Sequence, residues 1–156
     1  MIKLFRIDHR LLHGQVIFSW VNALGVDCIL VANDNVAQSE ERKTVLRMAK
    51  PAGVKLVMKS VDKSIEAINS GITNKYKLMV IVGSVADAYK LAKECPSITK
   101  VNYGNTLQSP TTRQLSEQIF LEADELEKTA ELIADGIACE IQPLSVDRSI
   151  NIADIL

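Results

Sequence analysis

The stretch Lys77-Leu78-Met79-Val80-Ile81-Val82 is strongly apolar, and Gly83-Ser84 follows it directly. A short continuous apolar run that ends in turn residues is typical of a strand buried on both faces of a sheet. Residues 85–93 then show the apolar spacing of a helix. A buried strand followed by a helix is the repeating unit of a parallel α/β sheet, so this stretch indicates the fold class.

The same unit recurs along the whole chain. The patterns predict strands at residues 2–7, 27–32, 54–58, 77–82, 98–102, 118–121 and 138–142, and helices at 15–24, 39–50, 61–69, 85–93 and 122–135. We therefore expect a single domain over residues 1–156, an α/β fold with a doubly wound, mostly parallel sheet of about seven strands and helices on both faces. Residues 103–116 form a polar stretch. The tail, residues 149–156, is apolar, and we expect it to dock either on its own domain or on the second subunit of a homodimer.

The composition excludes several classes of protein. With 18 Lys and Arg against 19 Asp and Glu, the formal net charge is -1, so no global field attracts nucleic acid or anionic lipid. No apolar run reaches the ~20 residues of a membrane span, and residues 1–5 are too short for a signal peptide. Cys28, Cys95 and Cys139 are widely spaced, which favours buried, reduced thiols and a cytoplasmic location.

Chemistry-bearing residues gather in one short segment. Both histidines of the chain, His9 and His13, lie with Arg6, Asp8 and Arg10 between the predicted strand 2–7 and the predicted helix 15–24. In open α/β sheets, ligands bind at the carboxyl ends of the strands. The segment is therefore the candidate functional site.

These residue types suit a histidine that carries a phosphoryl group. A neutral imidazole is a nucleophile near pH 7, and Arg10 together with the N–H groups at a helix start would stabilise phosphate oxygens. Gly14 would allow close approach of the backbone. Asp8 would hold the other ring nitrogen of a histidine and fix its tautomer.

Each residue also has a simpler interpretation. A histidine in a turn is often solvated, and the two arginines are compatible with surface ion pairs. His9 and His13 have the spacing of a zinc pair, but no third ligand is evident, so we expect no metal and no other cofactor. Trp20 fits core packing, and Ser84 fits a helix N-cap better than a site position. No glycine-rich nucleotide-binding pattern occurs.

The segment Arg6-Ile7-Asp8-His9-Arg10-Leu11-Leu12-His13-Gly14-Gln15-Val16 closely resembles the signature R-I-D-[DE]-R-L-[IL]-H-G-Q-V of a bacterial family. That family is the enzyme IIB component of the mannose/fructose/sorbose phosphotransferase systems (PTS). Residues 48–55 resemble its M-A-x-P-x-G-V-K stretch, and residues 122–126 with 132–137 resemble its final helix. The resemblance thus extends over the chain, and the family's fold is also doubly wound α/β.

The resemblance implies a relay and a set of site residues. The family's phosphorylated histidine corresponds to His13, modified on Nδ1, and Arg10, Asp8, Gly14 and Gln15 would surround the phosphate. Arg6, His9 and Ser84 would support them. Such a protein, a protein-N(pi)-phosphohistidine–sugar phosphotransferase, accepts the phosphoryl group from enzyme IIA. It passes the group to a sugar bound by the membrane permease IIC/IID, with which it associates peripherally from the cytoplasm.

Two positions depart from the family pattern. His9 replaces an acidic residue, and residues 102–105, Asn-Tyr-Gly-Asn, stand where N-V-G-G is common. Two other functions therefore stay open: a non-catalytic anion-binding or regulatory module of the same fold, and a metal-dependent hydrolase that uses His9, His13 and Asp8.

Overall fold

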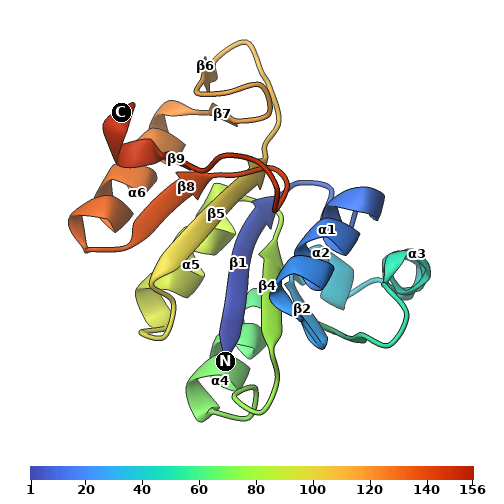
Figure 1. The fold of residues 1–156 in the computed structure, drawn as a ribbon. Coiled ribbons are helices and arrows are strands. Elements are labelled where there is room, and N and C mark those ends of the chain that lie inside the picture. The colour runs from blue at the N-terminus through green and yellow to red at the C-terminus, as the bar shows by residue number, and fades with distance from the viewer.

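The computed structural model describes residues 1–156 and contains one seven-stranded sheet in the order β3-β2-β4-β1-β5-β8-β9 (Figure 1). All neighbouring strands are parallel except β8 and β9, which pair antiparallel. The strands of this sheet are β1 (Ile2–Asp8), β2 (Cys28–Ala32), β3 (Lys55–Lys59), β4 (Leu78–Val82), β5 (Lys100–Asn105), β8 (Ala138–Ile141) and β9 (Ile150–Asn151). The predicted α/β class and the mostly parallel sheet are confirmed.

Helices cover both faces of the sheet. They are α1 (Gly14–Leu24), α2 (Asp34–Ala37), α3 (Glu40–Ala49), α4 (Val61–Ser70), α5 (Val85–Glu94) and α6 (Ala123–Ala134). The helices α1, α2 and α3 contribute to one apolar cluster of 14 buried residues, and α4, α5 and α6 contribute to another of 25. Two clusters on opposite sides of one sheet are the signature of a doubly wound fold.

Local signals in the sequence set the helix ends. Ser39, Ser60 and Ser84 each accept a hydrogen bond from the backbone N–H three residues on, and so cap α3, α4 and α5. Gly25 and Gly71 end α1 and α4 in the left-handed conformation that glycine adopts most readily. The N-cap interpretation of Ser84 is confirmed.

The predicted sixth strand, 118–121, is wrong as a member of the main sheet. Only Phe120–Leu121 (β7) is extended, and it pairs with Arg113–Gln114 (β6) in a separate two-stranded antiparallel sheet beyond the end of β5 (Figure 1). Leu121 is buried, so the apolar signal marks burial rather than sheet pairing. The place beside β5 is taken by β8, and β5 itself extends through Asn105, into the stretch predicted to be polar loop.

The chain end completes the sheet. Ile150–Asn151 pairs with β8, and a single 3-10 turn, η1 (Ile152–Asp154), follows with Ile152 fully buried. The tail therefore docks on its own domain, the first of the two predicted possibilities. The three cysteines are free and buried, as predicted. No helix has the length and apolarity needed to cross a membrane.

The topology creates a crevice at one sheet edge. Strands β1 and β4 are neighbours, yet the chain leaves β1 toward α1 on one face and leaves β4 toward α5 on the other. Loops that diverge in this way open a crevice at the carboxyl ends of the strands, where α/β proteins bind ligands. The segment from Asp8 to Gly14 lies at this switch point.

Candidate functional site

The turn between β1 and α1 is held by its own backbone and by two buried leucines. Leu11 donates its N–H to the carbonyl of Asp8 at 2.9 Å, and it has a φ of 60°, the only positive φ of a non-glycine residue. That conformation is strained for a branched side chain. Leu11 and Leu12 are 4% and 6% exposed, so packing holds the strained turn in place and fixes the residues on either side.

His13 occupies the N-cap of α1 with its side chain free. Its backbone is extended (φ -136°, ψ 106°), and its imidazole makes no capping hydrogen bond and is exposed. No acidic residue lies in the first turn of α1. The first N–H groups of a helix lack intrahelical partners and carry a partial positive charge. The exposed imidazole therefore stands beside donors that suit an anion.

Gly14 contributes through its backbone conformation. Its φ is +29°, and a Cβ at this position would meet no atom within 4 Å. The left-handed φ is a conformation that glycine adopts most readily, and the close approach of a phosphate to this backbone stays a prediction. Gln15 follows in the first turn of α1 and is exposed.

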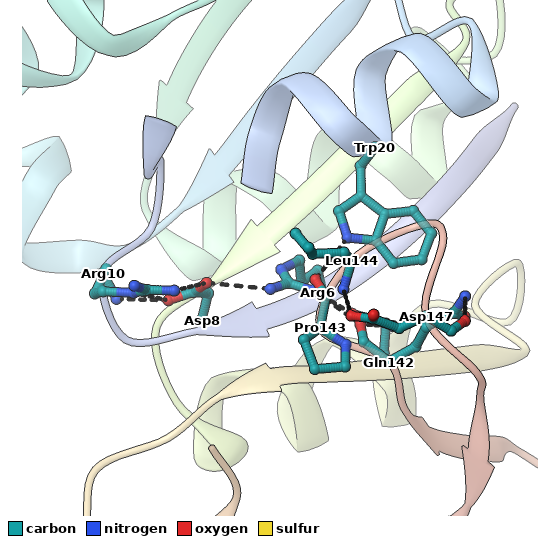
Figure 2. A network of polar contacts seen from close by, with 9 residues as sticks. Arg6, Asp8, Arg10, Trp20, Gln142, Pro143, Leu144 and Asp147 are labelled. Atoms are coloured by element: carbon teal, nitrogen blue, oxygen red, sulfur yellow. Dashed lines mark hydrogen bonds and ion pairs between the residues drawn. The ribbon is translucent and has the colours of Figure 1, made fainter. Parts of the chain in front are cut away.

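Asp8 joins the two arginines of the segment. Its Oδ1 accepts from the Arg10 backbone N–H at 3.0 Å and from Arg10 Nε at 3.3 Å, and its Oδ2 accepts from Arg6 Nη2 at 3.3 Å. Figure 2 shows the two guanidinium groups on opposite sides of this carboxylate. Asp8 makes no hydrogen bond to a histidine, so the prediction that it fixes a histidine tautomer is wrong. It orients Arg10 instead.

The two arginines differ sharply in their surroundings. Arg10 keeps 32% of its side chain exposed, whereas Arg6 keeps 1%. Arg6 Nη1 donates to Asn102 Oδ1 at 2.8 Å and to the Gln142 carbonyl at 3.2 Å. Burial lowers the pKa of the Arg6 guanidinium, and the ion pair with Asp8 works in the opposite direction.

The neighbours of Arg6 include residues that sequence reasoning missed. Asn102 lies opposite Arg6 on β5 and also donates to the Gln142 carbonyl at 3.1 Å. A Cβ on Gly104 would come within 2.1 Å of Arg6 Cζ, so the guanidinium lies directly against the backbone there. A glycine inside a strand is a sequence signal for such an approach.

A loop after β8 ties the network to α1. The indole N–H of Trp20 donates to the Pro143 carbonyl at 3.1 Å (Figure 2). The hydroxyls of Ser19 and Ser145 are 2.5 Å apart. Trp20 is 5% exposed, which confirms its predicted core position and adds a polar role. The sequence carried no signal for this contact, because the partner is a backbone carbonyl far along the chain.

His9 and Ser84 lie close to each other beside the turn. They line one pocket of about 240 Å³ together with hydroxyl side chains and Glu122. The His9 backbone N–H donates to the Asn105 carbonyl at 3.1 Å, and its buried Nδ1 makes no hydrogen bond. The structure brings together no group of three His, Cys, Asp or Glu side chains that could hold a metal ion.

Comparison with known proteins places this geometry in a family. The family described as PTS system sorbose subfamily IIB component matches residues 2–156. A probable phosphotransferase enzyme IIB component of Streptococcus pyogenes is 35% identical over 139 residues, which cover 86% of this chain and 85% of that protein. The mannose-specific EIIAB component of Escherichia coli is 30% identical over the whole chain, which spans 48% of that protein.

A solved structure agrees over nearly the full length. The IIBSor domain of the sorbose permease from Klebsiella pneumoniae superposes with a TM-score of 0.91 at 28% identity, covering 99% of this chain and 94% of that one. The similarity therefore includes the sheet, the helices and the turn that carries His13.

Proposed function

The chain belongs to the sorbose subfamily of IIB components of the phosphotransferase system, and from that premise we propose that His13 is its phosphoryl carrier. IIB components of this family serve sugar phosphotransferase systems as phosphotransferases. One observation carries the assignment to His13: its imidazole is exposed and free of hydrogen bonds at the N-cap of α1. His9, the other histidine of the chain, has one ring nitrogen buried.

The proposed transfer exchanges a phosphoryl group directly between two imidazoles. A lone pair on a ring nitrogen of neutral His13 attacks the phosphorus of a phosphohistidine on the donor. The new N–P bond forms as the donor's N–P bond breaks, and the donor imidazole leaves with that electron pair. Such a transfer depends on positioning and on stabilising charge at the equatorial oxygens.

Arg10 and the start of α1 supply that charge stabilisation. Asp8 occupies Nε and Nη2 of Arg10, which leaves Nη1 for a phosphate oxygen. The backbone N–H groups of Gly14 and Gln15 belong to the unpaired first turn. Asp8, predicted to contact phosphate, is 1% exposed and carries a charge that would repel it. Its role is to hold Arg10, and Arg6 in turn holds Asp8.

The partners follow from the same proposal. The donor is a IIA protein, and the similarity to half of a mannose-specific EIIAB component supports this pairing. The acceptor is a sugar bound by the membrane permease IIC/IID. We place the protein in the cytoplasm, in peripheral contact with that permease.

Intact-mass spectrometry after incubation with phosphoenolpyruvate, the general phosphotransferase proteins and a mannose-family IIA tests the proposal. Wild type should gain one acid-labile phosphoryl group, and so should His9→Ala. His13→Ala should gain none while keeping its circular dichroism spectrum. Folded wild type that stays unlabelled would overturn the carrier role and favour the regulatory, anion-binding module.

A further inference from the structure

A second cavity lies beside the turn, between its residues and α3. It measures about 240 Å³, and its polar lining consists of His9, Arg10, Glu41 and Arg42. Leu11 and Leu46 are among its apolar walls. The cavity shares Arg10 with the proposed phosphate site, but α3 supplies its opposite wall.

The basic side chains of this cavity are available for a ligand. Arg42 is exposed and forms no ion pair; only its backbone N–H is engaged, by the Ser39 hydroxyl at 3.2 Å. Arg10 Nη1 is free of hydrogen bonds, and it carries two hydrogens, so one can reach this cavity while the other remains for a phosphoryl group at His13. The imidazole of His9 forms no hydrogen bond, and its Nδ1 is buried. Two guanidinium groups with unused N–H donors thus line one cavity, and the ring of His9 forms part of the same wall.

The charge of the cavity favours an anion. Its lining carries two guanidinium groups, those of Arg10 and Arg42, and one carboxylate, that of Glu41, which is exposed and makes no ion pair. Arginine forks match the oxygens of phosphate and carboxylate groups.

We propose that the cavity formed by His9, Arg10 and Arg42 is an oxyanion-binding site separate from the His13 acceptor position. Its ligand is a phosphate-type oxyanion, either a free phosphate species or an anionic group on the protein that docks at His13. Arg42 is the residue that defines the site, since it contacts this cavity and takes no part in the geometry of His13. The existence of the site does not depend on His13 carrying a phosphoryl group; only the comparison of the two ligand sources uses transfer from IIA.

Titration with inorganic phosphate, followed by amide and imidazole NMR shifts, tests the site. Arg42→Ala should raise the Kd for phosphate about tenfold, the effect of losing about 1.4 kcal/mol of charged hydrogen bonding. Arg47→Ala removes an equal charge from α3 outside the cavity and should change the Kd less than about twofold. His13→Ala should leave phosphate binding at the cavity intact.

The outcomes separate this inference from the carrier role. Equal effects of Arg42→Ala and Arg47→Ala would overturn it, because they would indicate nonspecific attraction. Loss of phosphate binding in His13→Ala would also overturn it by locating the anion at the acceptor position. The source of the oxyanion follows from the kinetics of phosphoryl transfer from IIA, measured with wild type and with Arg42→Ala. If the KM for IIA is higher in the variant, the anion is carried by IIA. If the KM is unchanged, the anion is a free phosphate species.

Discussion

The Arg6 guanidinium occupies the space that a side chain at Gly104 would need, with 2.1 Å between an ideal Cβ and Arg6 Cζ. The absence of a side chain at Gly104 leaves room for the buried guanidinium of Arg6 between β1 and β5. This guanidinium donates a hydrogen bond to Asp8, which in turn accepts one from Arg10. The chemistry proposed for His13 depends on this chain of contacts, although Gly104 lies far from His13 in sequence.

Gly104→Ala should force Arg6 out of its position. We expect a loss of about 1–3 kcal/mol in the free energy of unfolding, the usual cost of overpacking a core, together with slower phosphorylation. Gly83→Ala is the control, because its Cβ would meet Asn33 Nδ2 at 3.3 Å and Leu11 Cδ2 at 3.6 Å, so these neighbours need to move by only a few tenths of an ångström. Urea denaturation measures the free energy of unfolding of both variants. Equal values would contradict the close contact between Gly104 and Arg6.

Asp8→Asn should destabilise the fold through Arg6. The substitution leaves a guanidinium that is 1% exposed without its counter-charge, and breaking a buried pair typically costs about 3–5 kcal/mol. Asp62→Asn breaks the exposed pair with Lys90 and should lower the free energy of unfolding far less, because solvent screens exposed charges. If the two variants unfold at the same urea concentration, the buried network contributes nothing.

Trp20→Phe should loosen the loop after β8. The ring stays apolar while the hydrogen bond from Nε1 to the Pro143 carbonyl is lost, at a cost of about 0.5–1.5 kcal/mol. Amide hydrogen exchange should accelerate in residues 143–148 and stay unchanged in β4. Uniform acceleration across the domain would indicate a global rather than a local effect.

The buried thiols make stability fall at high pH. Burial raises the pKa of Cys95 and Cys139 to about 11, against about 8.5 in an unfolded chain. The unfolded thiols therefore lose protons first, and the free energy of unfolding declines as the pH rises from about 8.5 to about 11. The double variant Cys95→Ala/Cys139→Ala should show a shallower decline in urea denaturation series. If the free energy of unfolding declined equally with pH in wild type and in the double variant, the two thiols would not cause the decline.

The strands and helices followed from periodicity because burial on both faces of a parallel sheet leaves continuous apolar runs, as at Leu78–Val82. Pairing was harder to predict. Residues 118–121 and 149–156 are both apolar, and only the second joins the main sheet, because tertiary position decides which run finds a partner.

The site residues also divide into those that local sequence reveals and those that tertiary structure brings in. His13, Arg10 and Asp8 stand in one short segment and were recognisable together. Asn102, Gly104 and the carbonyls of Gln142 and Pro143 reach the site through sheet register and loop packing. Gly104 did carry a signal, since a glycine inside a strand marks a close approach of the backbone. Backbone carbonyls carry no residue-specific signal, so local sequence could not reveal those of Gln142 and Pro143.

The most direct test of the central claim is to identify the nitrogen that carries phosphorus. Protein labelled with ¹⁵N-histidine and phosphorylated through IIA would be analysed by ¹⁵N and ³¹P NMR. The account predicts one phosphorus-coupled nitrogen, Nδ1 of His13, with the His9 ring uncoupled. Phosphorus coupled to a His9 nitrogen, or to neither ring, would contradict it.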